Sequence, residues 1–187
     1  MKKFELTAEF VTNVFGKKLF RIKALVAFGN VEKGELGGFI EKEDNLSHGG
    51  NAWVFGNARV SGNAQVFGNA WVSGNAWVSG DAQVFGNAQV SGNAQVSGDA
   101  RVSGNAQVFG NADYAVVTGF GRYFRATTFF RCKDKILRIQ CGCFYGDLAQ
   151  FREIVKKTHG DSKYAKEYLA IADLMELHFS DECGGEQ

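Results

Sequence analysis

The sequence predicts a mainly β protein whose central third is a parallel β-helix. Residues 51–110 are ten consecutive six-residue units without insertion or gap, from NAWVFG at the start to NAQVFG at the end. A short fixed period of this kind is typical of solenoids, in which each unit stacks on its neighbours. Two further observations support the prediction. Every unit has Ala and Val two positions apart, and every unit boundary joins Gly to Asn or Asp.

Each unit is predicted to form one side of a triangular coil. Ala and Val two positions apart point to the same side of a strand, so they line the interior. Gly and Asn tolerate positive φ, so each unit boundary forms a corner. Three units of six residues make a coil of eighteen, so the ten units form a little over three coils. We expect the N-terminal segment to add one more.

Stacking with this period sorts the outward residues onto three faces and into corner columns. The first face carries Trp53, Trp71, Gln89 and Gln107, the second Arg59, Trp77 and Gln95, and the third Gln65, Gln83 and Arg101. One corner column holds Asn63, Asp81 and Asp99, which are too few ligands for calcium, and another holds Phe67 and Phe85.

The tryptophans of these faces are candidate interface residues. Trp53 above Trp71 predicts an exposed aromatic strip, and Trp77 lies on the next face. Such a strip forms a subunit contact or a platform for a sugar or base. The alternative is a ladder of side chains that stabilises the sheet and binds nothing.

The segments on either side of the repeats are predicted to be distinct units. Residues 1–50 alternate in FELTAEF and FVTNVF, turn at 16–18 and continue in KKLFRIKALVAF, which predicts a β-hairpin. A solenoid needs such a cap because its end exposes strand edges and an open core. The sequence therefore divides into a cap at 1–50, a β-helix at 51–116 and a C-terminal domain at 117–187.

The C-terminal domain is predicted to contain a β-hairpin and two helices. VVTGFGRYFRATTFF and KILRIQCGCF form two strands around a turn at 133–135. Asp147 is the expected N-cap of a helix over 148–158 that ends near Gly160. A second helix starts at Asp161 or Ser162 and reaches about Phe179, with its inward positions at Tyr164, Tyr168, Ile171, Ala172 and Met175. This domain either caps the solenoid or mediates dimerisation.

Composition excludes several classes of protein. The formal net charge is +1, so no global charge favours nucleic acid or an acidic membrane surface. No apolar run is long enough to span a membrane, and MKKFELTAEF lacks the core of a signal peptide. The four cysteines lie in the last third, too few and too clustered for a disulfide framework, so we expect a cytoplasmic protein with reduced thiols.

The repeats resemble the hexapeptide transferase motif, which implies a left-handed parallel β-helix. The stretch LFRIKALVAFGNVEKGELGGFIEKEDNLSHGGNAWVFGNARV resembles the N-terminal part of an uncharacterised family of bacteria, phages and prophages, whose members are described as acyltransferases. The segments KILRIQCGCFYGDLAQF and HGDSKYAKEYL are similar to the tails of phage-type proteins. The resemblance implies a protein that acts in the cytoplasm of a bacterial host.

Acyl transfer on such a fold would need a general base. The resemblance implies a His near a trimer interface, with acyl-CoA between neighbouring prisms, and His48 in the cap is the candidate. The repeats themselves contain no His, no Lys and no extruded loop. The chain therefore departs from the catalytic pattern of these enzymes, and His48 is interpreted as a cap residue.

Two further groups of residues are candidates for binding. Cys132, Cys141, Cys143 and His159 are candidate zinc ligands, with Cys141 and Cys143 on one strand face, but their spacing is not that of a zinc knuckle. The basic and aromatic run GFGRYFRATTFFRCKDK suits phosphate, nucleotide or, more weakly, nucleic-acid contact. Its candidate residues are Arg122, Tyr123, Arg125 and Arg131.

Three hypotheses for function follow. The first is a non-enzymatic binding or scaffold protein, a homo-oligomer of two or three copies without a cofactor. The phage resemblance implies that it antagonises a host defence system by binding a host protein or by sequestering a nucleotide signal. The second is an acyltransferase that uses acyl-CoA and His48, and the third is a structural rod or virion component.

Overall fold

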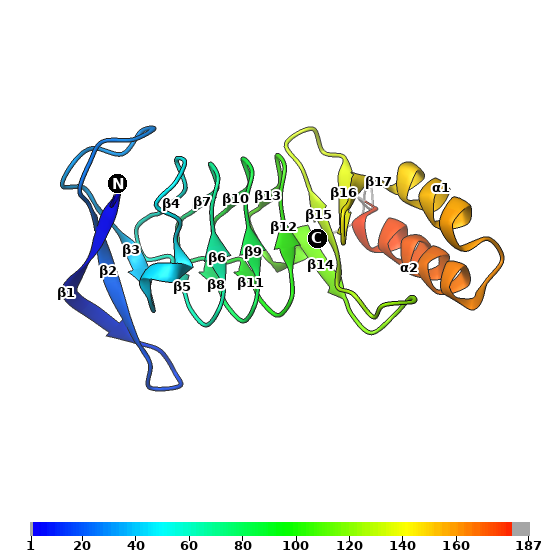
Figure 1. Cartoon of the computed structure of the whole chain (residues 1–187), viewed down its shortest axis with the longest axis horizontal. Helices are drawn as coiled ribbons and strands as arrows, with labels where there is room; N and C mark the ends of the chain where they lie inside the picture. The colour runs from blue at the N-terminus through cyan, green and yellow to red at the C-terminus, as the bar shows by residue number, and fades with distance from the viewer. Residues whose placement is uncertain (1, 181–187) are drawn as a thin grey trace, which may run out of the picture.

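A computed structural model describes residues 2–180 of the chain, which form an elongated molecule with a β-solenoid at its centre (Figure 1). The N-terminal part is an antiparallel sheet of β1 (Phe4–Thr12), β2 (Lys18–Ala24) and β3 (Leu36–Ile40). β3 then pairs in parallel with the second solenoid strand, so the cap continues directly into one face of the solenoid. The predicted N-terminal β cap is confirmed.

The solenoid consists of ten two-residue strands, one from each sequence unit. They are β4 (Trp53–Val54), β5 (Arg59–Val60), β6 (Gln65–Val66), β7 (Trp71–Val72), β8 (Trp77–Val78), β9 (Gln83–Val84), β10 (Gln89–Val90), β11 (Gln95–Val96), β12 (Arg101–Val102) and β13 (Gln107–Val108). Strands eighteen residues apart pair in parallel, for example Gln65 with Gln83 and Gln83 with Arg101. The three predicted faces are therefore confirmed residue by residue.

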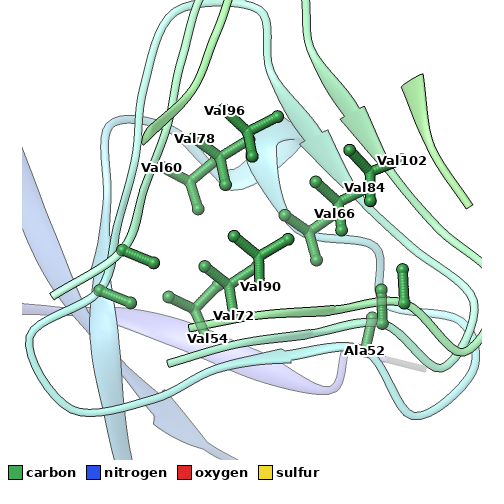
Figure 2. Packing of buried hydrophobic residues seen from close by; sticks show 14 of the residues in the cluster. Ala52, Val54, Val60, Val66, Val72, Val78, Val84, Val90, Val96 and Val102 are labelled. Carbon is green, nitrogen blue, oxygen red and sulfur yellow. The ribbon is translucent and has the colours of Figure 1, made fainter. Parts of the chain in front are cut away.

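Alanine and valine side chains fill the interior of the solenoid. Figure 2 shows three valine columns that converge on the axis, one from each face. The Ala and Val of every unit are fully buried. Backbone N–H groups of one coil donate to carbonyl groups of the next, so the ladders satisfy the polar atoms that surround this apolar core.

The corners explain why each unit ends in glycine. Gly80 has φ +69°, and a Cβ added there would lie 2.9 Å from the backbone nitrogen of Gly98 in the next coil. In the corner column of Asn63, Asp81 and Asp99, Asn63 Nδ2 donates a hydrogen bond of 3.0 Å to Asp81 Oδ1 of the next coil. Phe67 and Phe85 stack in parallel with their centroids 4.9 Å apart. Both predicted corner columns are confirmed.

The prediction of an exposed aromatic strip at Trp53 and Trp71 is wrong. Trp53 is fully buried, with its ring against Phe4, Phe28 and Phe55. Trp53 belongs to the first coil, where the N-terminal segment lies over the first face and takes the place of a preceding coil. Trp71 is half-buried against Phe55, so the first face does not present an open tryptophan ladder.

The C-terminal part contains a four-stranded antiparallel sheet and two helices. Its strands are β14 (Tyr114–Val117), β15 (Thr127–Arg131), β16 (Leu137–Cys141) and β17 (Phe144–Asp147), in that order across the sheet. The helices are α1 (Leu148–His159) and α2 (Lys163–Phe179), and two short 3-10 helices, η1 (Glu43–Asn45) and η2 (Asn111–Asp113), flank the solenoid.

The two predicted helices are confirmed, but the predicted hairpin is incomplete. The hairpin is β15–β16, and the long first strand expected before it divides into β14, a loop at 118–126 and β15. Asp147 and Ser162 are the helix N-caps. Tyr164, expected to face inward, is 37 % exposed because it lies at the edge of the helix pair, with its ring 6.3 Å from that of His159.

Strand β15 joins the solenoid to the helices because its two faces belong to different cores. Phe130 extends the apolar core of the solenoid, whereas the adjacent Phe129 packs into a second core with α1 and α2. The Arg101 N–H donates to Thr128 Oγ1 at 2.9 Å, and Ser103 Oγ donates to Gln140 Oε1 at 3.1 Å. The C-terminal sheet therefore closes the open end of the solenoid.

Candidate ligand-binding site

The loop at 118–126 lies beside the helices at the C-terminal end of the solenoid (Figure 1). Gly119 and Gly121 have φ values of +84° and +71°, and Phe124 also has a positive φ of +52°, which is unusual for a side chain of this size. The Gly121 N–H donates to Glu167 Oε2 at 2.9 Å and ties the loop to α2. The loop backbone therefore runs against the helix in a fixed conformation that costs some strain.

Three exposed side chains of this loop form a cationic and aromatic cluster. The guanidinium carbons of Arg122 and Arg125 lie 5.5 Å and 5.0 Å from the centre of the Tyr123 ring. The electron-rich ring face attracts both cations and holds them close together. Within residues 2–180, neither guanidinium takes part in an ion pair. Paired N–H donors of this kind can bind an anion.

An apolar cavity of about 220 Å³ opens beside this cluster. Its lining comes from the loop, the β16–β17 turn, α1 and α2, and consists of Arg122, Tyr123, Arg125, Cys141, Cys143, Phe144, Phe151, Ile154, Val155, Thr158, His159 and Tyr168. The His159 ring lies 5.8 Å from that of Tyr168 at 31°, and the Phe151 ring meets Tyr168 edge-on. The cavity thus combines aromatic walls with cations at its mouth.

Tyr168 forms the junction of the loop, the turn and the helix. Burial raises the pKa of Tyr168 to about 12, with a further contribution from the neighbouring Cys141 thiol. The phenol is therefore neutral at physiological pH. Gly121 lies against this ring, and a Cβ added at Gly121 would overlap with the Tyr168 hydroxyl group.

A second, polar cavity of about 510 Å³ lies on the solenoid side of the same loop. Its lining is Asp81, Gln83, Asp99, Arg101, Tyr123, Phe124, Arg125, Ala126 and Gly142. Tyr123 and Arg125 line both cavities. The third face of the solenoid and its acidic corner column therefore reach the candidate site.

The four candidate zinc residues are not all brought together: Cys141, Cys143 and His159 line the apolar cavity, but Cys132 does not. Cys132 packs into the solenoid core, where burial raises the pKa of its thiol, while Cys141 lies on the helix side and accepts a hydrogen bond of 3.2 Å from Thr127 Oγ1. Cys141 and Cys143 do not share a strand face, because Gly142 and Cys143 form the turn after β16. Among residues 2–180 no three His, Cys, Asp or Glu side chains are arranged to hold a metal ion.

Two other predicted candidates lie away from the site. Arg131 is at the far end of β15, where its Nη2 donates to the carbonyl of Phe179 at 3.2 Å and its guanidinium stacks on the Phe179 ring. Trp77 is half-buried on the second face, and its Nε1–H donates to Ser61 Oγ at 3.1 Å. The structure groups Arg122, Tyr123 and Arg125 but separates Arg131 and the tryptophans from them.

His48 is held by the N-terminal cap. Its Nδ1 accepts the Lys3 N–H at 3.1 Å, so its Nε2 carries the proton and donates to Glu43 Oε1 at 2.6 Å. This hydrogen bond lowers the pKa of Glu43, and the imidazole stacks on Phe4 with the ring centres 4.3 Å apart. An open depression of about 800 Å³ lies next to His48, but both ring nitrogens are engaged within the cap.

Several residues of the site are missed by sequence reasoning. Phe144, Phe151 and Tyr168 follow patterns of strands and amphipathic helices, so the sequence assigns them to packing, and His159 was expected only as a candidate zinc ligand. The Gly-Phe-Gly segment at 119–121 is the one signal for a loop at this position, because two glycines so close together favour positive φ. Asp81 and Asp99 are identified only as a corner column.

The comparisons with known proteins concern the solenoid alone. Residues 64–80, 82–98 and 94–110 match the family model described as YdcK beta solenoid repeat. A search of curated proteins finds no match. The matched residues form coils of the solenoid and include neither the loop at 118–126 nor the helices. The chain is thus similar to these repeats in its central fold. No helix in the described residues is long and apolar enough to cross a membrane.

Proposed function

We propose that this protein is a non-enzymatic binding protein whose C-terminal cavity holds a small ligand with an aromatic ring and an anionic group, as in a nucleotide. The observation that carries the proposal is the placement of Tyr123 and two guanidinium groups at the mouth of an apolar cavity. Ligand sites commonly combine apolar walls with a few polar groups that fix orientation.

The aromatic ring and the anionic group of the ligand are inferred from the aromatic walls and the guanidinium groups of the site, respectively. The walls formed by Phe144, Phe151 and Tyr168 suit a flat ring, because aromatic side chains stack on or against one another. The guanidinium groups of Arg122 and Arg125 suit a phosphate, since Arg presents paired N–H donors that match its oxygens. The solenoid supplies a rigid support for this site.

The biological role that fits this chemistry is sequestration. A protein that binds a nucleotide signal tightly lowers its free concentration without transforming it. This matches the resemblance to phage proteins and retains the predicted role as an antagonist of a bacterial host defence. The proposal includes the predicted homo-oligomer of two or three copies.

Isothermal titration calorimetry with AMP tests the proposal. We expect binding that weakens with added salt, because the contact is between charges. Arg125→Gln is expected to reduce the affinity about 10- to 100-fold, the typical effect of losing charge-assisted hydrogen bonds. Arg59→Gln, which removes the same charge on the second solenoid face, is the matched control and should leave the affinity unchanged.

A second pair of variants tests the role of the aromatic ring. Tyr123→Phe keeps the ring that holds both guanidinium groups and should bind AMP like the wild type, whereas Tyr123→Ala should bind it weakly. Native mass spectrometry of the same preparation reports the number of subunits and any co-purified nucleotide. The absence of AMP, ADP and GMP binding at millimolar concentration, or equal affinity for wild type and Arg125→Gln, would refute the proposal.

A further inference from the structure

The two cavities at the loop share a wall. Tyr123 and Arg125 line both of them, and the β16–β17 turn contributes Cys141 and Cys143 to the apolar cavity and Gly142 to the polar one. Arg125 passes close to this turn, because a Cβ added at Gly142 would lie 2.9 Å from its Nη1 atom. A group bound to Arg125 therefore lies at the boundary between the two cavities.

The two cavities differ in chemistry. The helix-side cavity has aromatic and aliphatic walls, whereas the solenoid-side cavity presents two carboxylates, an amide and, besides the shared Arg125, the guanidinium of Arg101. The hydrogen bond from Asn63 orients Asp81. Arg101 stacks on Phe85, and its guanidinium carbon lies 5.7 Å from the centre of that ring. Arg101 Nε is buried and has no hydrogen-bond partner among the described residues.

The two carboxylates of the polar cavity stand at positions where the other repeat units have Asn. Eight of the ten units begin with Asn and two begin with Asp, at positions 81 and 99. Both aspartates fall in one column, and both line the cavity next to Tyr123 and Arg125. A corner needs only a residue that tolerates its turn, which Asn provides elsewhere, so the fold does not require acids at these two positions.

This chemistry selects what the polar cavity accepts. Carboxylates accept hydrogen bonds from hydroxyl groups and repel a further phosphate. Dinucleotide-binding folds use an acidic residue in this way to hold ribose hydroxyl groups. Gln83 and Arg101 add donors for hydroxyl and ring oxygens. The cavity therefore suits a sugar.

We propose, building on the function proposed above, that the ligand is a nucleoside diphosphate that carries a sugar. Its base lies in the apolar cavity, its diphosphate contacts Arg125 at the shared wall and Arg122 beside it, and its terminal sugar lies against Asp81, Asp99 and Gln83 on the third face of the solenoid. The solenoid is then a part of the binding site as well as its support.

Calorimetry on the full chain with AMP, ADP and ADP-ribose tests this proposal. ADP-ribose is expected to bind at least 10-fold more tightly than ADP. Asp99→Asn should weaken ADP-ribose binding about 10-fold and should leave ADP binding equal or slightly stronger, since it removes a hydrogen-bond acceptor for the sugar and a repulsive charge for the phosphate. This variant is expected to preserve the fold, because Asn occupies the first position in eight of the ten units, including Asn63 in the same corner column. Asp44→Asn, at the opposite end of the solenoid, is the control.

The outcomes separate this proposal from the one on which it rests. If AMP binds in an Arg125-dependent manner but ADP-ribose binds no more tightly than ADP, the nucleotide function stands and the sugar site is wrong. If Asp99→Asn strengthens ADP and ADP-ribose binding equally, Asp99 acts only as a charge, and the sugar site is again wrong. If none of the three probes binds, both proposals fail.

Discussion

Replacing Gly121 by Ala disturbs the contact that places the loop at 118–126 on α2. Gly121 has φ +71°, and the added methyl group would overlap with the Tyr168 hydroxyl group. The left-handed conformation costs an L-residue about 1–2 kcal/mol, and overpacking against a buried ring adds about 1–3 kcal/mol. The hydrogen bond to Glu167 is also lost if the loop moves away. We expect the free energy of unfolding to fall by about 3 kcal/mol, together with a loss of AMP binding as Arg122 and Arg125 shift.

Gly119 provides the matched control for this prediction. It lies in the same loop with φ +84°, but a Cβ added there would meet no atom within 4 Å. Gly119→Ala therefore carries only the conformational cost of about 1–2 kcal/mol. Urea unfolding followed by circular dichroism compares the two variants with the wild type. Independent mutational effects on stability add to within about 0.5 kcal/mol, so a smaller difference between two variants is not significant. If the unfolding free energies of the two variants agree within this range, the loop is not docked on Tyr168 and the reasoning fails.

Substitutions at three further positions test other parts of the structure. Val78→Ala in the solenoid core should lower the unfolding free energy in urea by about 2 kcal/mol, because it removes two fully buried methyl groups and leaves a cavity; an unchanged midpoint would contradict the packed core. Burial lowers the pKa of Lys3 from 10.5 to about 8, so between these values the unfolded chain holds a proton that the native chain releases. The unfolding free energy of the wild type minus that of Lys3→Met should therefore rise by up to about 3 kcal/mol from pH 8 to pH 10.5. A difference that stays constant over this pH range in urea titrations would refute this. Asp147→Ala removes the cap hydrogen bond to the Gln150 N–H at 2.9 Å and should cost about 1 kcal/mol in thermal unfolding, whereas Asp147→Asn should cost less.

The sequence alone determined the solenoid, its three faces and its corner columns. This was possible because the environment of each repeat residue depends on residues at fixed spacing, such as Gln65 beside Gln83 and Phe67 on Phe85. The helices at 148–159 and 163–179 were equally accessible, since Asp147 and Ser162 mark their starts by local hydrogen bonds.

Only the tertiary structure decided where the ends of the solenoid are covered and which residues form the candidate site. Trp53 is buried because the cap lies over the first coil, a contact that the period of the repeat does not encode. The two cavities arise because the two faces of β15 join the solenoid to the helices, which brings Tyr168 to the loop on one side and Asp99 to it on the other. Such contacts between segments far apart in the chain depend on how whole elements pack, so no local pattern predicts them.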